Sequence, residues 1–524
     1  MNSSNPRLLP ALTLALLALV PNLPAQSATP TVLADFAASS NPNGPTNAVT
    51  PLIQDGNGNF YGTTNGGGAN GLGSIYELTA AGQYVTLYNF TAADGQFPNG
   101  SLYRTSDGSL YGTTFRGGTN NYGTVFQLTP AGVLNTLHSF NLTDGRGPVG
   151  ALFVDGTGNF YGVTAGGGVN NTGTIYQLAT NGTLTTLHSF VTADGTAPQN
   201  GLIQAGDGKF YGTTSYNGTP DNRGTGNGTV FSYNPNGGAY TVVHQFDGAN
   251  DGNGAFAGLI QGRDGAFYGA NPTGGANGQG TLFKVTAGGA FTVLHAFSAL
   301  DASNDNADGA SPVGTLIDGG DGRFYGTTSA GGSGGQGTLF ALTPAGVLTT
   351  LYSFGAVDQA GVNADGGGAS AALLKAPDGR FYLPTTQGGA AAAGTLDAFT
   401  VTQLHPAFFD GAVALDNNVQ YLAFPAGNIF GYYTFRSDAN YLYHFDLGDE
   451  YVINTNDSQN GVYLYDFKSG SFFYTSPSYP FPYLYDFSLG AVLYYYPDPN
   501  NPGRYNTNGT RYFYNFATGQ IITK

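Results

Sequence analysis

The stretch DASNDNADG (301–309) gathers oxygen-bearing side chains that suit a hard cation. Its carboxylates, Asp301, Asp305 and Asp308, stand among Ser and Asn oxygens, which are the ligands that calcium prefers. The segment lacks the spacing and the terminal Glu of an EF-hand loop. We therefore predict a loop site for calcium made of these three carboxylates, and we expect no other cofactor.

Aspartate followed by glycine recurs in two further series. The first series falls where a tight hairpin turn is expected, and it comprises Asp55, Asp107, Asp155, Asp207, Asp264, Asp321 and Asp378. The second series falls in the longer loop between repeated units, and it comprises Asp94, Asp144, Asp194, Asp251, Asp308 and Asp365. We interpret the first as turn residues, whereas the second lies in loops that can carry a binding site.

Histidine also recurs at a fixed place in the repeated pattern. The set comprises His138, His188, His244, His295 and His405, and the same slot accepts Tyr88 and Tyr352. Equivalent slots of a ring lie far apart, so these histidines do not share one metal ion. A Ser-His-Asp catalytic set would require one unit to depart from the others, and no unit shows such a departure.

These residues are carried by a repeat whose aromatic-Tyr-Gly word returns seven times. The equivalent tyrosines are Tyr61, Tyr111, Tyr161, Tyr211, Tyr268, Tyr325 and Tyr382, first 50 and later 57 residues apart. A period of this size indicates a propeller or a solenoid. Each unit contains four short strands, as in GTIYQL, TTLHSF, GLIQA and KFYGTTS across the third and fourth copies, with Asp-Gly and Gly-Gly turns between them.

Seven units of four antiparallel strands predict an all-β, seven-bladed β-propeller over residues 29–410. A solenoid remains the alternative. The segment TVLADF (32–37) resembles the fourth strand of later units, and the seventh unit loses its final hairpin turn. We therefore expect the N-terminal strand to complete the last blade, which would leave no open sheet edge. The glycine after each Tyr is expected to make room for a ring from the next blade.

The two ends of the chain differ from the repeats. Residues 1–28 carry Arg7, the apolar run LLPALTLALLALV and small residues, which predicts a secretory signal peptide cleaved near Ala25 to Ala28. Residues 411–524 are dense in Tyr and Phe, as in YLYDFKSGSFFY. This pattern predicts a C-terminal domain of repeated aromatic β-hairpins. No later apolar run is long enough to span a membrane.

Composition excludes several classes of protein. The formal net charge is −16 with only 16 Lys and Arg, so there is no basic surface for nucleic acid. Cysteine is absent, which excludes disulfides and acylation of an N-terminal Cys. An exported chain of this kind must be held together by its own core.

The words DGSLYGTT, GGTNNYGTVFQL and LHSF resemble the GloVer tandem repeat of bacterial choice-of-anchor proteins. The resemblance covers about residues 32–410, although Leu383 replaces the glycine of the seventh unit. It implies an exported repeat array with a variable C-terminal anchor, and no assigned reaction.

These features favour an exported, non-catalytic propeller that binds or displays a glycan or protein at the cell surface. The C-terminal hairpins are the candidate non-covalent anchor. An enzyme acting on extracellular polysaccharide and a structural matrix protein remain the alternatives. One loop end that gathers carboxylates and aromatics from several blades would favour a ligand site.

Overall fold

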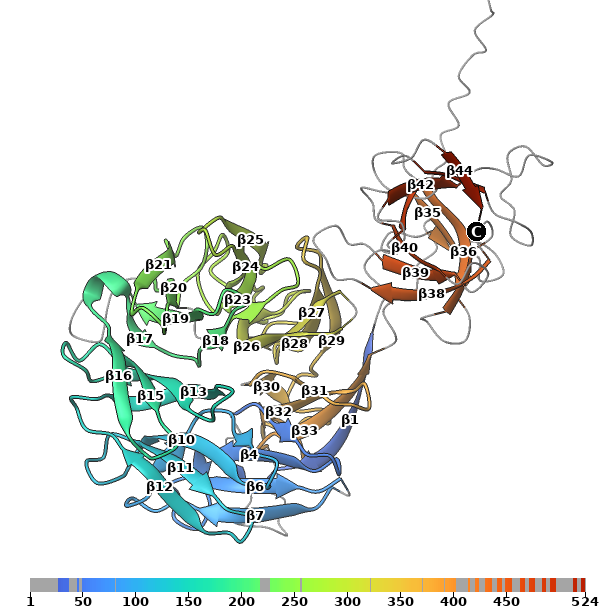
Figure 1. The fold of residues 1–524 in the computed structure, drawn as a ribbon. Helices are drawn as coiled ribbons and strands as arrows, with labels where there is room; N and C mark the ends of the chain where they lie inside the picture. The colour runs from blue at the N-terminus through green and yellow to red at the C-terminus, as the bar shows by residue number, and fades with distance from the viewer. Residues whose placement is uncertain are drawn as a thin grey trace, which may run out of the picture.

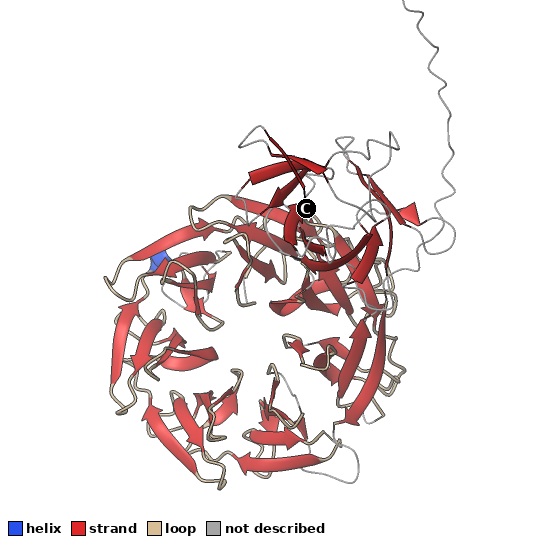
Figure 2. Cartoon of the chain, turned by 45° about the vertical axis from the view of Figure 1, so that its right-hand side comes forward, coloured by secondary structure: helices blue, strands red, loops and turns tan. Residues whose placement is uncertain are grey.

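The protein is seen here in a computed structural model. It describes residues 27–36, 45–46, 50–80, 82–216, 227–254, 257–320, 322–369, 371–390 and 392–401, and beyond these the strands between 413 and 523. Residues 28–401 form seven antiparallel sheets of four or five strands. Figure 2 shows these sheets arranged radially about a common centre, as the blades of a propeller. The predicted seven-bladed propeller is thus confirmed, and the solenoid alternative is wrong.

The first four blades follow one another along the chain. Within each blade the strands run in order from the centre of the ring outward. Blade 1 contains β3 (Ile53–Gln54), β4 (Phe60–Thr64), β6 (Ser74–Leu78) and β7 (Tyr84–Asn89). Blade 2 contains β8 (Gln96–Pro98), β9 (Tyr103–Arg104), β10 (Leu110–Arg116), β11 (Thr124–Leu128) and β12 (Leu134–Ser139). Blade 3 contains β13 (Arg146–Val154), β14 (Phe160–Gly166), β15 (Thr174–Leu178) and β16 (Leu184–Ser189). Blade 4 contains β17 (Thr196–Pro198), β18 (Ile203–Gln204), β19 (Phe210–Tyr216), β20 (Thr229–Tyr233) and β21 (Tyr240–Gln245).

The remaining blades keep this plan. Blade 5 contains β22 (Ile260–Gln261), β23 (Phe267–Asn271), β24 (Thr281–Val285) and β25 (Phe291–Ala296). Blade 6 contains β26 (Ala310–Asp318), β27 (Phe324–Ala330), β28 (Thr338–Leu342) and β29 (Leu348–Ser353). Blade 7 contains β30 (Gly367–Ala369), β31 (Leu374–Lys375), β32 (Phe381–Gln387), β33 (Thr395–Val401) and β1 (Ala28–Asp35). A short pair, β2 (Pro45–Thr46) with β5 (Gly66–Gly67), and one 3-10 turn, η1 (Thr192–Asp194), complete the described ring.

The ring is closed by the first strand of the chain, as predicted. β1 pairs antiparallel with β33, in a register that runs from Ala28 opposite Val401 to Asp35 opposite Thr395. In Figure 1 the blue β1 lies beside the orange β33. The amide of Phe36 extends the contact by donating to the carbonyl of Gly394 at 2.9 Å. The outer edge of blade 7 is therefore covered by a segment from the opposite end of the repeat array.

The repeated Phe-Tyr-Gly word supplies the contact between neighbouring blades. The Tyr of one blade packs on the Phe of the next, with ring centroids 4.0–4.9 Å apart in five consecutive blade pairs and 4.5 Å apart where blade 7 meets blade 1; the pairs are Tyr111–Phe160, Tyr161–Phe210, Tyr211–Phe267, Tyr268–Phe324, Tyr325–Phe381 and Tyr382–Phe60. Only Tyr61 meets an aliphatic residue, Leu110, within one core cluster. The Phe-Tyr-Gly motif recurs because each copy contacts both neighbouring blades, through its Phe on one side and its Tyr on the other.

The glycine after each Tyr serves a different contact from the one predicted. Gly112 lies opposite Phe126 of the neighbouring strand in the same blade, and a Cβ there would come within 2.7 Å of the Phe126 ring. The prediction of a ring from the next blade was therefore wrong. In blade 7 the pair is exchanged, because Leu383 lies opposite the buried Asp397. The larger side chain at one position is matched by the smaller one across from it.

A backbone hydrogen bond also joins each blade to the next. Near the start of the innermost strand, six consecutive blades place one residue in the left-handed region, with φ between +53° and +69°: Phe97, Gly147, Ala197, Gly254, Ser311 and Gly368. Each of these amides donates to a loop carbonyl of the preceding blade at 2.8–3.1 Å. Three of the six are not glycine, so the hydrogen bond must offset the strain of that conformation.

The C-terminal strands form one antiparallel sheet in chain order. They are β34 (Val413–Ala414), β35 (Gln420–Ala423), β36 (Ile429–Phe435), β37 (Tyr441–His444), β38 (Gly448–Asn454), β39 (Val462–Asp466), β40 (Ser471–Thr475), β41 (Tyr483–Asp486), β42 (Ala491–Tyr495), β43 (Tyr512–Asn515) and β44 (Gln520–Thr523). Tyrosines repeatedly face tyrosines across the register, as in Tyr451–Tyr465, Tyr463–Tyr474 and Tyr483–Tyr494. The predicted signal peptide lies almost entirely outside the described residues.

Candidate functional site

Two of the three carboxylates of the predicted calcium loop, Asp301 and Asp308, accept hydrogen bonds from different parts of the chain. Asp301 accepts hydrogen bonds from the amides of Ser303 and Asp305, at 2.7 and 3.0 Å, and so closes a local turn. Asp308 instead accepts from Nε2 of His295 at 2.9 Å and from Ser298. In the part of the chain that the structure describes, no three His, Cys, Asp or Glu side chains are grouped so that they could hold a metal ion. Calcium binding at this loop stays a prediction, to be tested by titration.

The histidine series and the second aspartate series form pairs, which the sequence reasoning missed. The imidazole–carboxylate pairs are His138–Asp144, His188–Asp194, His244–Asp251 and His295–Asp308, at 2.9–3.1 Å. Tyr88 and Tyr352 donate to Asp94 and Asp365 in the same way, at 2.6 and 2.5 Å. In each case the aspartate follows its His or Tyr partner by six to thirteen residues, and this spacing was the sequence signal for the pairing. His405 lies outside the described residues, and only the backbone of His444 is described.

The same aspartates connect one blade to the next. The backbone carbonyls of all of them but Asp365 accept a hydrogen bond from a buried threonine of the following blade; Asp144, for example, accepts from Thr174 Oγ1 at 3.0 Å. Each imidazole also packs edge-on against a buried Phe, as His138 does on Phe140. These arrangements give both series a structural role at the blade junctions.

The first aspartate series holds the hairpin turns, as interpreted. Asp207 accepts from the amide of Lys209 and from the hydroxyl of Tyr211, and Gly208 after it has φ +80°. In blades 1 and 3 the aspartate stands two positions earlier, so that Gly58 and Gly158 supply the positive φ. Burial would raise the pKa of Asp155, but hydrogen bonds from Thr157 and Asn159 outweigh it and lower this pKa to about 2. Asp321 lies outside the described residues.

One pocket departs from the uniformity of the blades. It has a volume of about 500 Å³ and is lined by parts of blades 2, 3 and 4: Phe115, Arg116, Asn121, Tyr122, Arg146, Gly147, Ala165, Gly166, Ala197, Gln199 and Tyr216. We call it the Arg116–Arg146 pocket. Its size is within the roughly 300–1,000 Å³ usual for sites of small ligands. Its walls come from the C-terminal ends of β10, β14 and β19 and from the N-terminal ends of β13 and β17. These strand ends lie at the same end of the ring.

Two glycines shape the walls of the Arg116–Arg146 pocket. A Cβ on Gly147 would come within 2.7 Å of the Phe115 ring, so the absence of a side chain lets that ring pack over the backbone. A Cβ on Gly166 would come within 2.9 Å of the Arg146 guanidinium, which therefore lies against β14. Arg146 is half-buried in this position, whereas Arg116 is exposed.

The arginines occupy positions that vary from blade to blade. At the end of the second strand, paired with the start of the innermost strand, blade 2 has Arg116 with Gln96 and blade 3 has Gly166 with Arg146. Blade 6 has only Ala330 with Ala310 at the equivalent place. The sequence signal for Arg116 is the replacement of small residues by Phe-Arg after the repeated GTT.

No described carboxylate neutralises the charges of the two arginines. Elsewhere in the ring, Lys209, Arg263, Lys284 and Arg380 each pair with an aspartate, at 2.7–3.7 Å. Among the described residues, neither Arg116 nor Arg146 forms an ion pair. The lining residues that the structure describes include no Asp or Glu. Two cations are thus available in a chain with a net charge of −16.

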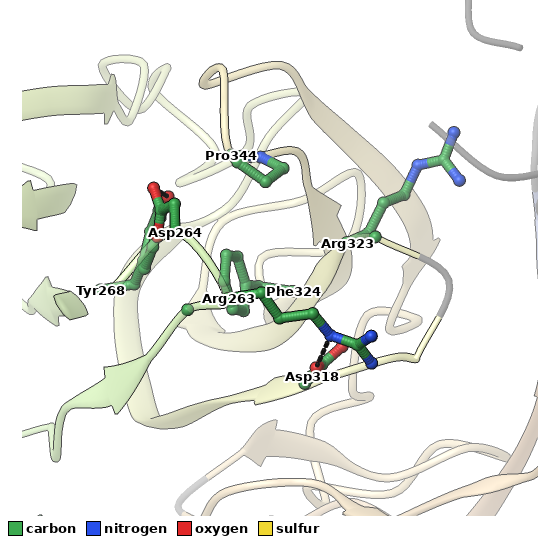
Figure 3. A pocket seen from close by; sticks show the side chains of 9 residues that line it. Arg263, Asp264, Tyr268, Asp318, Arg323, Phe324 and Pro344 are labelled. Carbon is green, nitrogen blue, oxygen red and sulfur yellow. Dashed lines mark hydrogen bonds and ion pairs between the residues drawn. The ribbon is translucent and has the colours of Figure 1, made fainter. Parts of the chain in front are cut away.

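A second pocket, between blades 5 and 6, is occupied by its own side chains. Figure 3 shows Arg263 and Asp318 directed toward each other, and they form an ion pair at 3.6 Å. The rings of Tyr268 and Phe324 pack there with centroids 4.3 Å apart. The remaining space is about 20 Å³, which is room for about one water molecule. This pocket leaves no space for a ligand.

Asp397 is an acid that the solvent does not reach. It is fully buried in β33, where its Oδ2 accepts from Thr395 Oγ1 at 2.6 Å and its Oδ1 has no hydrogen-bond partner among the described residues. Burial raises its pKa to about 8, and nearby Asp365 and Asp35 add to the rise, while the Thr395 hydrogen bond opposes it. Without access to a substrate, this carboxyl is not a candidate catalytic acid.

Comparison with known proteins identifies the repeat. A model of the Gloeobacter/Verrucomicrobia repeat matches residues 22–156, 143–307 and 225–413. No curated protein matches the chain in sequence.

Several solved structures are similar in fold. The extracellular domain of a hybrid two component system from B. thetaiotaomicron has 12% identity and a TM-score of 0.46, over 95% of this chain and 58% of that one. A gluconolactonase from Xanthomonas campestris has 15% identity and a TM-score of 0.35, over 60% and 88%. TolB from Acinetobacter baumannii has 12% identity and a TM-score of 0.31, over 54% and 61%. This chain therefore spans little more than half the length of the first of them, and likenesses this distant say nothing of a shared activity.

Proposed function

This chain belongs to the Gloeobacter/Verrucomicrobia repeat family, and on that basis we propose that it is an exported, non-catalytic binding propeller. In this proposal the Arg116–Arg146 pocket holds a ligand, a glycan or a segment of protein, at the cell surface. The observation that carries the proposal is the departure of this pocket from the repeat. Blades that are otherwise nearly uniform differ where three of them meet at one end of the ring.

The absence of catalysis is part of the proposal. The recurring Asp and His side chains, which are the obvious acids and bases, hold turns and blade junctions. The pocket itself offers guanidinium, amide and phenol groups, which bind and orient but make poor general bases at neutral pH. The alternative is an enzyme that acts on extracellular polysaccharide. Release of reducing ends from bacterial or plant polysaccharides by the purified protein would favour that alternative.

The binding role is tested by filling the pocket without changing its charge. Ala165 lines the pocket at the position where blade 2 has Phe115, so Ala165→Phe fills part of the pocket with a large uncharged side chain. We expect this variant to lose the binding that the full chain shows on a glycan array or to envelope proteins. Val169→Phe, on a loop position that is 87% exposed, is the matched control. Equal binding by both variants would refute a ligand site in this pocket.

The C-terminal strands are proposed as the attachment to the cell. The supporting observation is the repeated placement of Tyr opposite Tyr in their register, because such rows can stack on sugar rings or on a second copy. Among the described residues, no helix is long and apolar enough to cross a membrane. Fractionation of cells that express the full chain or residues 1–410 tests the proposal. Equal retention in the envelope would show that the tail is not the anchor.

A further inference from the structure

The Arg116–Arg146 pocket has features that narrow the class of ligand it can take. This inference rests on the proposed binding function and adds the chemistry of the ligand. We propose that the pocket recognises an anionic saccharide, a glycan that carries carboxylate or sulfate groups, with Arg116 and Arg146 as the anion-binding residues.

The first argument is charge. A guanidinium that has no carboxylate partner among the described residues, in a pocket whose described lining has no Asp or Glu, favours a ligand that brings its own negative group. The chain as a whole has a net charge of −16, so its overall field opposes the approach of polyanions and a site that binds one needs local positive charge. The two arginines therefore give selectivity as well as affinity.

The second argument is placement. Arg116 ends β10 of blade 2 and Arg146 begins β13 of blade 3, so the two guanidinium groups are carried by strands of adjacent, tightly packed blades. Arg146 is held against the backbone of β14, because Gly166 has no side chain to displace it. A guanidinium fixed in this way can offer two parallel N–H groups to a planar carboxylate or to a sulfate with little loss of side-chain entropy.

The third argument is the remainder of the lining. Phe115, Tyr122 and Tyr216 provide aromatic surface, and Asn121 and Gln199 provide amides. The Oδ1 of Asn121 already accepts from the Gly117 amide at 3.0 Å, which orients its amide group. Aromatic faces for the apolar side of a sugar ring and amides for its hydroxyls complete a site for a saccharide. A nucleic acid does not fit, because its many phosphates need a broad basic surface.

The experiment measures binding of the purified full chain to three probes by calorimetry. They are oligogalacturonate, a sulfated oligosaccharide and a neutral oligosaccharide of similar length. We expect one or both anionic probes to bind, more weakly as salt is raised, and the neutral probe to bind at least about tenfold more weakly. The two anionic arms distinguish the carboxylate from the sulfate as the recognised group.

Variants connect the affinity to the two side chains. Arg116→Gln and Arg146→Gln should each weaken binding of the anionic probe by about tenfold or more, and Arg146→Lys should also weaken it because the planar fork is lost. Arg263→Gln, which removes an equal charge from the other pocket, is the control and should bind as the unchanged protein does. Unfolding midpoints of all variants verify that the ring is intact.

The results separate this inference from the proposed function. Preferential binding of the neutral probe, lost in Ala165→Phe but not in the arginine variants, would overturn the anionic ligand and keep the binding site. Equal binding of an acidic peptide such as oligoglutamate, in competition with the saccharide, would overturn the saccharide class. Failure of every probe, and of envelope glycans and proteins, to bind in a manner sensitive to Ala165→Phe would overturn both.

Discussion

At the scale of the residue, the seventh blade shows how one side chain depends on the one across from it. Six blades place a glycine opposite an aromatic ring, and blade 7 places Leu383 opposite Asp397. The exchange fills the space but leaves a carboxyl in the core. The groups that face it are Asp365 and Asp35, which carry like charge, and Thr395, which donates one hydrogen bond. The neutral form of Asp397 is the one that the fold accommodates.

This burial predicts a dependence of stability on pH. The folded pKa of about 8 lies above the ordinary value of about 3.9, so the contribution is fully present below about pH 4 and is lost as pH rises to about 8. Asp397→Asn keeps the shape and cannot ionise. We expect the variant to gain stability relative to the unchanged protein across this window, on the order of a few kcal/mol by about pH 8.

Denaturant unfolding of both proteins at a series of pH values measures the effect. Other aspartates with lowered pKa, such as Asp155, titrate equally in both and cancel in the difference. A difference between the two proteins that stays constant across the series would contradict a neutral Asp397 in the fold.

At the scale of the element, the strands could be predicted from the repeated sequence motifs, because each strand makes the same contact in every blade. Hairpin turns were predictable from Asp-Gly, since positive φ has a local cause. The identity of the ring over Gly112 was not predictable, because alternation shows which face a residue occupies and not which neighbour covers it. The pocket could not be predicted from the repeat pattern, because that pattern identifies positions that recur. Arg116 and Arg146 do not recur from blade to blade.

The close contact at Gly112 predicts a position-dependent cost of adding one methyl group. Gly112→Ala would place its Cβ 2.7 Å from the Phe126 ring, in a core with no room to relax, and should destabilise the fold by about 1–3 kcal/mol. Gly156→Ala is the matched control, because its Cβ would have no atom within 4 Å. Denaturant midpoints compare the two, and equal midpoints would show that the blade adjusts to the added group.

At the scale of the whole molecule, β1 closes the ring by pairing with β33 of the last blade. The N-terminal match to the fourth strand predicted this pairing from sequence, since the seventh unit lacked its own last strand. Phe36, which directly follows β1, is 2% exposed, whereas Val32 within β1 is 36% exposed.

The importance of closure is testable within that one segment. Phe36→Ala should lower stability by about 3–5 kcal/mol, as expected for a large aromatic removed from a core, whereas Val32→Ala should change it little. Deletion of residues 28–40 should lower the unfolding midpoint strongly or broaden the transition. An unchanged melting curve for the deletion would mean that blade 7 does not need the first strand.

The pairing of β1 with β33 also determines the order in which the newly synthesised chain can complete its ring. Asp35 accepts from the amide of Ala390, 355 residues later, so the first strand of the ring to leave the ribosome is the last strand of the ring to find its partner. At about 5–20 residues per second, β1 waits roughly 20–70 s with both of its edges unpaired. During that interval the blades already synthesised can pack against one another, while the ring stays open between the first blade and the last. Synthesis rate, and any factor that shields β1 while it waits, would then govern how many chains close on themselves and how many join a neighbour.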